Sequence, residues 1–140
     1  MIKSHKVFLE SAVLFAFIDR SDSNHQKTVK IMETLAHEHY QLYTSVFNVT
    51  ETYTALSREI GMSVALEFLE TILSSNIEIL YLQKSDFISA FKVLKSNKER
   101  QINLKEVLNA TLMEKRGISQ VITFAFWHNL YGTYVSKLTS

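Results

Sequence analysis

The feature that most constrains this chain is the alternation of short apolar runs with long helical segments in a sequence with few breaks. It contains no Pro and only three Gly, at positions 61, 117 and 132, so little interrupts a helix. Apolar runs of strand length lie at residues 6–9, 41–44, 77–82 and 120–124. Amphipathic spacing and capping residues predict helices at 13–18, about 24–38, 46–60, 63–74, after a cap at Ser85, and at 104–116.

Strands separated by helices of this length predict a parallel sheet covered on both faces. The expected fold is therefore α/β, a three-layer α/β/α sandwich with a central parallel sheet of four strands, or five if residues 131–138 add one. The chain has 140 residues, 46% of them hydrophobic and 21% charged, which is typical of one folded domain. We expect a single domain over residues 1–140.

The composition excludes several kinds of site and location. Without Cys, neither a disulfide framework nor a thiolate zinc site can form, so a metal would need carboxylate, imidazole or carbonyl ligands. The start of the chain, MIKSHK, is not a signal peptide, and no apolar run is long enough to cross a membrane. We expect a cytoplasmic protein. The net charge of +1 does not identify a partner and does not exclude nucleic acid.

Three carboxylates are expected at the carboxyl edge of the predicted sheet, where open parallel sheets place their functional crevice. Glu10 ends the first strand, Glu51 lies in the helix after the second, and Glu106 begins the helix before the fourth. Converging carboxylates repel one another unless a cation neutralises them, and oxygen ligands suit Mg²⁺ or Mn²⁺. Such an ion can hold a phosphodiester and activate water.

Each carboxylate also has a simpler interpretation, and the residues alone leave both open. Glu10 can be a surface residue at a strand end, paired with a Lys. Glu51 can be a solvated helix residue, and Glu106 a favourable anion in a first helical turn.

The order of these segments resembles the PIN domain, and most closely its small toxin type VapC, whose antitoxin partner is VapB. The resemblance spans nearly the whole chain and is carried by VFLESAVLFAFIDRSDSNHQ, YTSVFNVTETYTALSREIG, ALEFLETILSS, INLKEVLNATLMEKRGI and VITFAFWHNLYG. It implies the α/β/α fold and a Mg²⁺- or Mn²⁺-dependent ribonuclease. It also implies an RNA substrate, a VapB-like antitoxin and a homodimer. Its acidic metal ligands, which would also be the catalytic residues, fall on Glu10, Glu51 and Glu106.

The sequence departs from this family at the site itself. Glu10 and Glu106 stand where Asp is usual, Ala125 replaces a fourth acid, and Ala12 replaces a hydroxyl residue. Each Asp-to-Glu change moves a carboxylate outward by ~1.5 Å, whereas Mg²⁺ demands near-ideal contacts. Lys105 replaces a small hydroxyl residue, and its ammonium can stand in for the cation.

Three functions therefore stay open. The first is a ribonuclease scaffold with weakened or lost activity, with Ser11 and Lys105 as RNA contacts. The second is an inactive PIN-like module that binds RNA or a protein partner. The third is a structural subunit of a homo-oligomer, through the apolar helices at residues 46–73.

Other conspicuous residues have ordinary structural interpretations. The basic residues Lys92, Lys95, Lys98 and Arg100 can form a solvated helix face or, with Lys105, line an RNA path. We expect His37 and His39 at a helix end, and Asp19 and Asp22 in a capping turn. We expect Trp127 and His128 to pack against the sheet edge rather than stack on a base.

Overall fold

The computed structural model describes residues 5–128, 130–131 and 136–137. Within this part of the chain the strands are β1 (Lys6–Leu9), β2 (Gln41–Ser45), β3 (Glu78–Leu80), β4 (Gln120–Ile122) and β5 (Ser136–Lys137). The helices are α1 (Ser11–Ile18), α2 (His25–His37), α3 (Val46–Glu59), α4 (Met62–Ser74), α5 (Lys84–Ser96), the 3-10 helix η1 (Lys98–Arg100) and α6 (Leu104–Lys115).

The strands form one parallel sheet in the order β3-β2-β1-β4-β5. The first strand lies at its centre, and Phe8 pairs with Tyr43 of β2 on one side and with Val121 of β4 on the other. The predicted parallel sheet is therefore confirmed. The described part of the predicted strand at 131–138 contains β5, while residues 132–135 and 138 lie outside the described residues.

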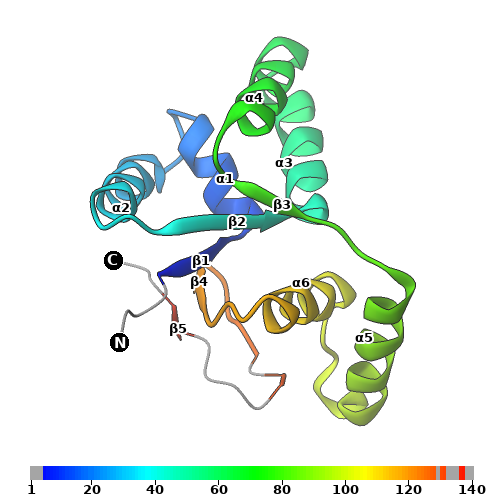
Figure 1. Cartoon of the computed structure of the whole chain (residues 1–140). Helices are drawn as coiled ribbons and strands as arrows, with labels where there is room; N and C mark the ends of the chain where they lie inside the picture. The colour runs from blue at the N-terminus through cyan, green and yellow to red at the C-terminus, as the bar shows by residue number, and fades with distance from the viewer. Residues whose placement is uncertain (1–4, 129, 132–135, 138–140) are drawn as a thin grey trace.

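Successive residues of the central strand point to opposite faces of the sheet, as the pleat requires. Val7 and Leu9 pack into a core that includes buried side chains of α1, α2, α3 and α4. Phe8 packs on the other face with residues of α6, and α5 covers α6 from outside through Ala90. The two helical layers lie above and below the sheet in Figure 1. This arrangement confirms the three-layer sandwich.

Most predicted boundaries are correct to within one or two residues, and one cap was wrong. The helix α5 is capped by Gln83 and not by Ser85. Its capping box pairs Gln83 with Asp86, and the Gln83 N–H donates to Asp86 Oδ2 at 2.8 Å. Asp86 is buried and is also bonded to Lys115 at 3.3 Å, so a tertiary contact supports this earlier start.

The helix after β2 is capped by Ser45. Ser45 Oγ accepts a hydrogen bond from the Asn48 N–H at 3.2 Å and so satisfies a free donor of the first turn of α3. None of the described helices combines the length and the apolar character needed to span a membrane.

Candidate active site at the carboxyl edge of the sheet

Glu10 follows the last residue of β1 and stands directly before α1. Its backbone N–H donates to the Ile122 carbonyl at 3.2 Å, which fixes it beside the end of β4. Its side chain accepts a hydrogen bond from Thr123 Oγ1 at 2.8 Å. The same Thr123 oxygen accepts the Ala125 N–H at 3.1 Å. Thr123, the residue that follows β4, therefore holds the Glu10 side chain. It also fixes the backbone of Ala125, which stands in the place of the fourth acid.

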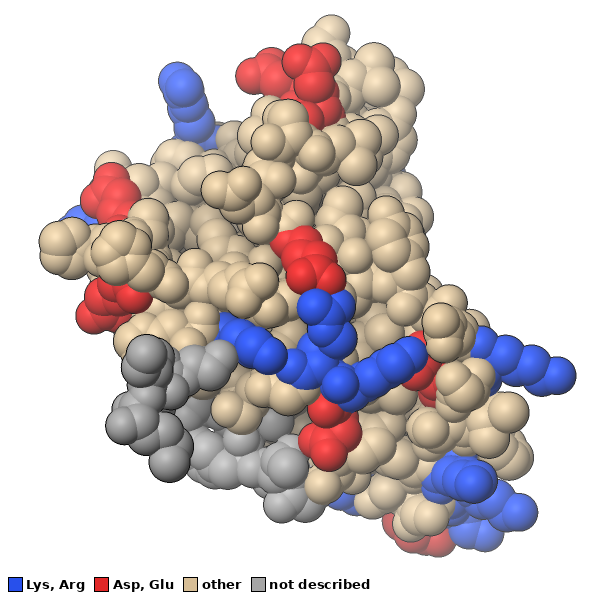
Figure 2. Space-filling view, in the orientation of Figure 1, with Lys and Arg blue, Asp and Glu red and all other residues tan. Residues whose placement is uncertain are grey.

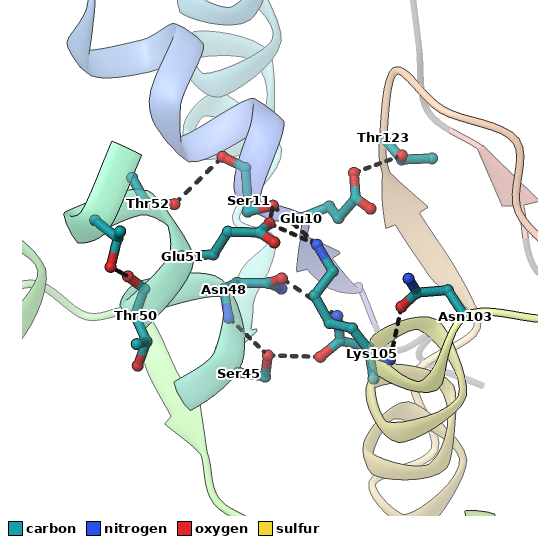
Figure 3. A network of polar contacts seen from close by, with 12 residues as sticks. Glu10, Ser11, Ser45, Asn48, Thr50, Glu51, Thr52, Asn103, Lys105 and Thr123 are labelled. Atoms are coloured by element: carbon teal, nitrogen blue, oxygen red, sulfur yellow. Dashed lines mark hydrogen bonds and ion pairs between the residues drawn. The ribbon is translucent and has the colours of Figure 1, made fainter. Parts of the chain in front are cut away.

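Glu51 lies on α3 and meets residues from two other helices. Lys105 Nζ, from the first turn of α6, lies 2.5 Å from Glu51 Oε1. The Ser11 hydroxyl, from the start of α1, donates to the same oxygen, and Lys105 Nζ lies 3.3 Å from Ser11 Oγ. Figure 3 shows these three side chains converging, with the Glu10 side chain turned toward Thr123. The site thus contains an ion pair between a carboxylate and an ammonium, with a hydroxyl bonded to the same carboxylate oxygen.

The ionisation of Glu51 reflects this pair. Partial burial raises the pKa of Glu51, but the hydrogen bonds from Lys105 and Ser11 and the charge of Lys105 lower it by more. The net pKa therefore lies below its ordinary value of 4.5, and Glu51 is a carboxylate at neutral pH.

Glu106 is bonded to a residue of the loop after β4. Its Oε2 accepts the His128 backbone N–H at 2.7 Å and lies 2.8 Å from His128 Nδ1. Both side chains are largely buried, at 15% exposure for Glu106 and 20% for His128. This contact uses both a backbone and a ring nitrogen, so it fixes the orientation of the carboxylate.

A buried polar network lies beneath these carboxylates and joins β1, β2, α3 and α6. Asn109 of α6 accepts from Ser45 Oγ at 2.6 Å and donates to Asn48 Oδ1 at 3.2 Å. Asn48 and Thr44 in turn donate to the Leu9 carbonyl, at 3.1 Å and 2.7 Å. All four polar side chains are fully buried. The network therefore ties α3 and α6 to the end of β1, directly before Glu10.

A cleft opens beside Glu51. Its cavity has a volume of about 460 Å³ and is bounded by α1, α3 and the turn before α2. It is lined by Ser11, Ala12, Phe15, Asp22, Asn24, Glu51, Thr52, Ala55, Arg58, Glu59 and Phe124. A ligand in this cleft would reach Glu51 and Ser11 directly.

The site as it stands does not fit a divalent metal ion. The described residues contain no group of three or more His, Asp or Glu side chains placed to hold one. Glu10 is bonded to Thr123, Glu51 to Ser11 and Lys105, and Glu106 to His128. The assignment of Glu10, Glu51 and Glu106 as metal ligands and catalytic residues stays a prediction.

Several other sequence interpretations are confirmed. Asp19 and Asp22 accept backbone N–H groups of Ser21 and Asn24 at 3.0 and 2.8 Å, as expected of a capping turn. Trp127 is buried in the core beneath the sheet. His37 ends α2, and His39 follows it with a left-handed φ of 60°.

The surface shown in Figure 2 carries Lys and Arg side chains in a row over the region of β4 and α6. Asp and Glu side chains lie directly above and below this row. The ion pairs of this region include Arg116 with Glu78 at 2.6 Å and Lys115 with Asp86 at 3.3 Å. This face is therefore mixed in sign and does not by itself indicate a polyanionic partner.

Sequence reasoning missed Thr123 and Asn109, and it missed the bond between His128 and Glu106. Thr123 has a visible signal, because it is the first polar residue after the apolar strand. Asn109 is a lone amide among the apolar residues of α6, which also sets it apart. The partner of His128 lies 22 residues away, and no local pattern reveals such a contact.

The comparisons with known proteins agree with this fold. The PIN domain family model matches residues 7–124. The crystal structure of Mycobacterium tuberculosis VapC20, a sarcin-ricin loop cleaving toxin, is similar at a TM-score of 0.71 and 21% identity, covering 91% of this chain and 95% of that one. The structure of VapBC2 from Rickettsia felis bound to a DNA fragment from its promoter gives a TM-score of 0.67 and 14% identity, covering 86% and 88%.

The search of curated proteins finds no match. The two structures establish similarity of fold, and the family model covers most of the sequence with its boundaries at the start of β1 and just after β4. The chain therefore belongs to the PIN domain family.

Proposed function

We propose that this chain is a VapC-type PIN protein that binds RNA at the carboxyl edge of its sheet and has little or no Mg²⁺- or Mn²⁺-dependent ribonuclease activity. The RNA part is supported by family membership and by the similarity to the fold of a toxin that cleaves the sarcin-ricin loop. The loss of cleavage is supported by the contacts of the three carboxylates. This proposal includes the cytoplasmic location expected from the sequence.

One observation carries the proposal: each candidate metal ligand is already bonded to a protein group, and Glu51 is bonded to an ammonium. A metal-dependent nuclease needs carboxylate oxygens free to bind the ion and to activate water. Here the closest cation to Glu51 is Lys105, which cannot lower the pKa of a bound water as a metal ion does.

Positive charge for an RNA strand is available along α5 and η1, next to α6. Lys84, Lys92 and Lys95 are exposed on α5, and the one carboxylate of this helix, Asp86, is buried against Lys115. The exposed charges of α5 are therefore all positive, and they lie among the exposed apolar residues Phe87, Ile88 and Phe91. Such a face binds phosphates by counterion release, with an affinity that falls as salt is added.

The test measures binding and cleavage separately. Purified protein is incubated with a structured RNA and Mn²⁺ or Mg²⁺ beside a Glu51→Gln control, and binding is measured in EDTA by fluorescence anisotropy. We expect RNA binding that weakens with added salt, and a cleavage rate equal to that of the control. Cleavage that disappears in Glu51→Gln would contradict the loss of activity, and the absence of salt-dependent binding would contradict the RNA part.

A protein partner is the second candidate, because the described residues form two apolar surfaces away from the carboxylates. One is a groove between α1, α2 and α4, lined almost entirely by apolar residues such as Leu14, Phe17 and Phe68. It suits the apolar face of an amphipathic helix, such as a segment of a VapB-like antitoxin.

The other surface is an apolar stripe on α4. Met62, Leu66, Leu69 and Leu73 recur at spacings of four, three and four residues, the pattern of a helix seam, and three of them are exposed. The adjacent stripe of the same helix, with Ala65, Phe68 and Ile72, is buried in the core. We propose that the outer stripe pairs two copies of the chain into the expected homodimer.

A further inference from the structure

We infer that the Lys105 ammonium is a built-in substitute for the divalent cation of this site, and that removing it uncovers a metal site on Glu51. This inference rests on the proposed function, because it takes Glu51 as the remnant of a metal ligand. It goes further by attributing the loss of metal binding to Lys105 and by predicting that substitution of Lys105 restores it.

The geometry places the ammonium where a cation would be. Lys105 Nζ is 2.5 Å from Glu51 Oε1 and 3.3 Å from Ser11 Oγ, so it contacts oxygens contributed by α3 and α1. A hard cation at this edge would bind the same Glu51 carboxylate. The ammonium would repel a divalent ion bound to the same carboxylate, so the two cations compete for Glu51.

The position of Lys105 at the start of α6 directs its side chain to Glu51. Asn103 caps α6 by accepting the Lys105 N–H at 2.7 Å, which fixes the backbone from which this side chain extends. A cation in a first helical turn is unfavourable, because the helix N-terminus already carries positive charge. Glu51 compensates for this charge. The Lys105 side chain is only 30% exposed, so it is directed onto Glu51 and away from solvent.

The contact of Glu10 does not oppose metal binding in the same way as the ion pair of Glu51. Glu10 accepts from a neutral hydroxyl and brings no second cation to the edge. It also directly precedes Ser11, whose hydroxyl donates to Glu51, so its backbone is close to the pair. Glu10 is therefore the carboxylate best placed to complete the uncovered site with Glu51.

The test uses Mn²⁺ alone and needs no RNA. Electron paramagnetic resonance of free Mn²⁺ is followed in titrations of the wild type, Lys105→Ser, Lys105→Arg and the double variant Lys105→Ser/Glu51→Gln. We expect Lys105→Ser to bind Mn²⁺ about 10- to 100-fold more tightly than the wild type, the scale on which neighbouring groups tune metal affinity. Lys105→Arg keeps the charge and should match the wild type, and the double variant should lose the gain.

Lys105→Gln is the second uncharged variant, and circular dichroism verifies the fold of each protein. A folded Lys105→Ser or Lys105→Gln protein with no gain in Mn²⁺ affinity would overturn the inference. If the double variant Lys105→Ser/Glu51→Gln kept the gain in Mn²⁺ affinity, the inference would also be overturned. A wild type that cleaves no RNA, yet binds Mn²⁺ as tightly as Lys105→Ser, would overturn this inference and leave the proposed function standing.

Discussion

At the scale of single residues, the chemistry of this PIN domain depends on what surrounds Glu51. The carboxylate is half exposed, yet it accepts from both Lys105 and Ser11. An exposed ion pair of this kind contributes little to stability. The pair matters because it balances the charge of the ionised Glu51 carboxylate with a side chain. A nuclease of this fold would use a metal ion there.

The lowered pKa of Glu51 predicts a pH dependence. A carboxylate with a lower pKa in the folded state stabilises the fold fully above its ordinary value of 4.5, and this contribution is lost as the pH falls through the folded value. Glu51→Gln removes the carboxylate, so the difference in unfolding free energy between wild type and variant should be constant near neutral pH and shrink in acid. Urea denaturation at a series of pH values measures it.

The matched control for this experiment is Glu67→Gln, which removes an exposed carboxylate from α4. This change should leave the acid limb of the stability curve unaltered. A difference between wild type and Glu51→Gln that is the same at all pH values would show that Glu51 is not coupled to Lys105.

At the scale of elements, helix ends decide where each segment turns back toward the sheet. The helix α6 ends at Gly117 in a Schellman motif, with Ile118 N–H donating to the Met113 carbonyl at 2.9 Å and a φ of 67° at the glycine. The helix α2 ends in the same way, with Tyr40 N–H donating to the Leu35 carbonyl at 2.9 Å. The left-handed residue there is His39, with a φ of 60°, and not a glycine.

This difference predicts that His39→Gly stabilises the protein. A left-handed conformation costs a residue with a Cβ about 1–2 kcal/mol. Substitution by Gly removes this cost, but the greater conformational freedom of Gly in the unfolded chain offsets part of the gain. We expect a net gain of about 1 kcal/mol in the free energy of unfolding, seen as a raised midpoint in urea.

The control has the opposite sign. Glu33→Gly, at an exposed position inside α2, should cost about 1 kcal/mol because Gly is a poor helix former. If His39→Gly lowered stability as Glu33→Gly does, the Schellman ending of α2 would be wrong.

At the scale of the whole molecule, α4 has two apolar stripes, of which one is buried in the core and the other is exposed. The outer stripe exposes 53% of Leu66 and 64% of Leu73. A second chain would remove this surface from water, and a Lys placed there would leave an unpaired charge in the interface.

We therefore predict that the wild type has twice the mass of one chain in light scattering after size exclusion, and that Leu66→Lys/Leu73→Lys has the mass of one chain. Glu67→Lys, also exposed on α4, changes the charge well away from the stripe and should stay a dimer. A single-chain mass for the wild type, or an unchanged mass for the double variant, would contradict pairing through α4.

The fold was largely predictable because its signals are local. A short apolar run is formed by Val7, Phe8 and Leu9. Such a run between helices rarely adopts any structure other than a buried parallel strand. The start of α1 at Ser11, two residues before the predicted one, was not predictable, because Glu10 and Ser11 are held by contacts with β4 and α3. The Gln83 cap depends in the same way on Asp86 and its contact with α6.

The sequence by itself determined the sandwich, the family and the edge of the sheet that carries Glu10, Glu51 and Glu106. Periodicity, strand ends and helix caps are properties of neighbouring residues, so they can be read along the chain. Only the tertiary structure decided the state of that edge: Glu10 bonded to Thr123, Glu51 to Lys105 and Glu106 to His128. The physical reason is that carboxylates are neutralised by whatever cation or donor the fold brings within hydrogen-bonding distance, and these partners lie 22 to 113 residues away.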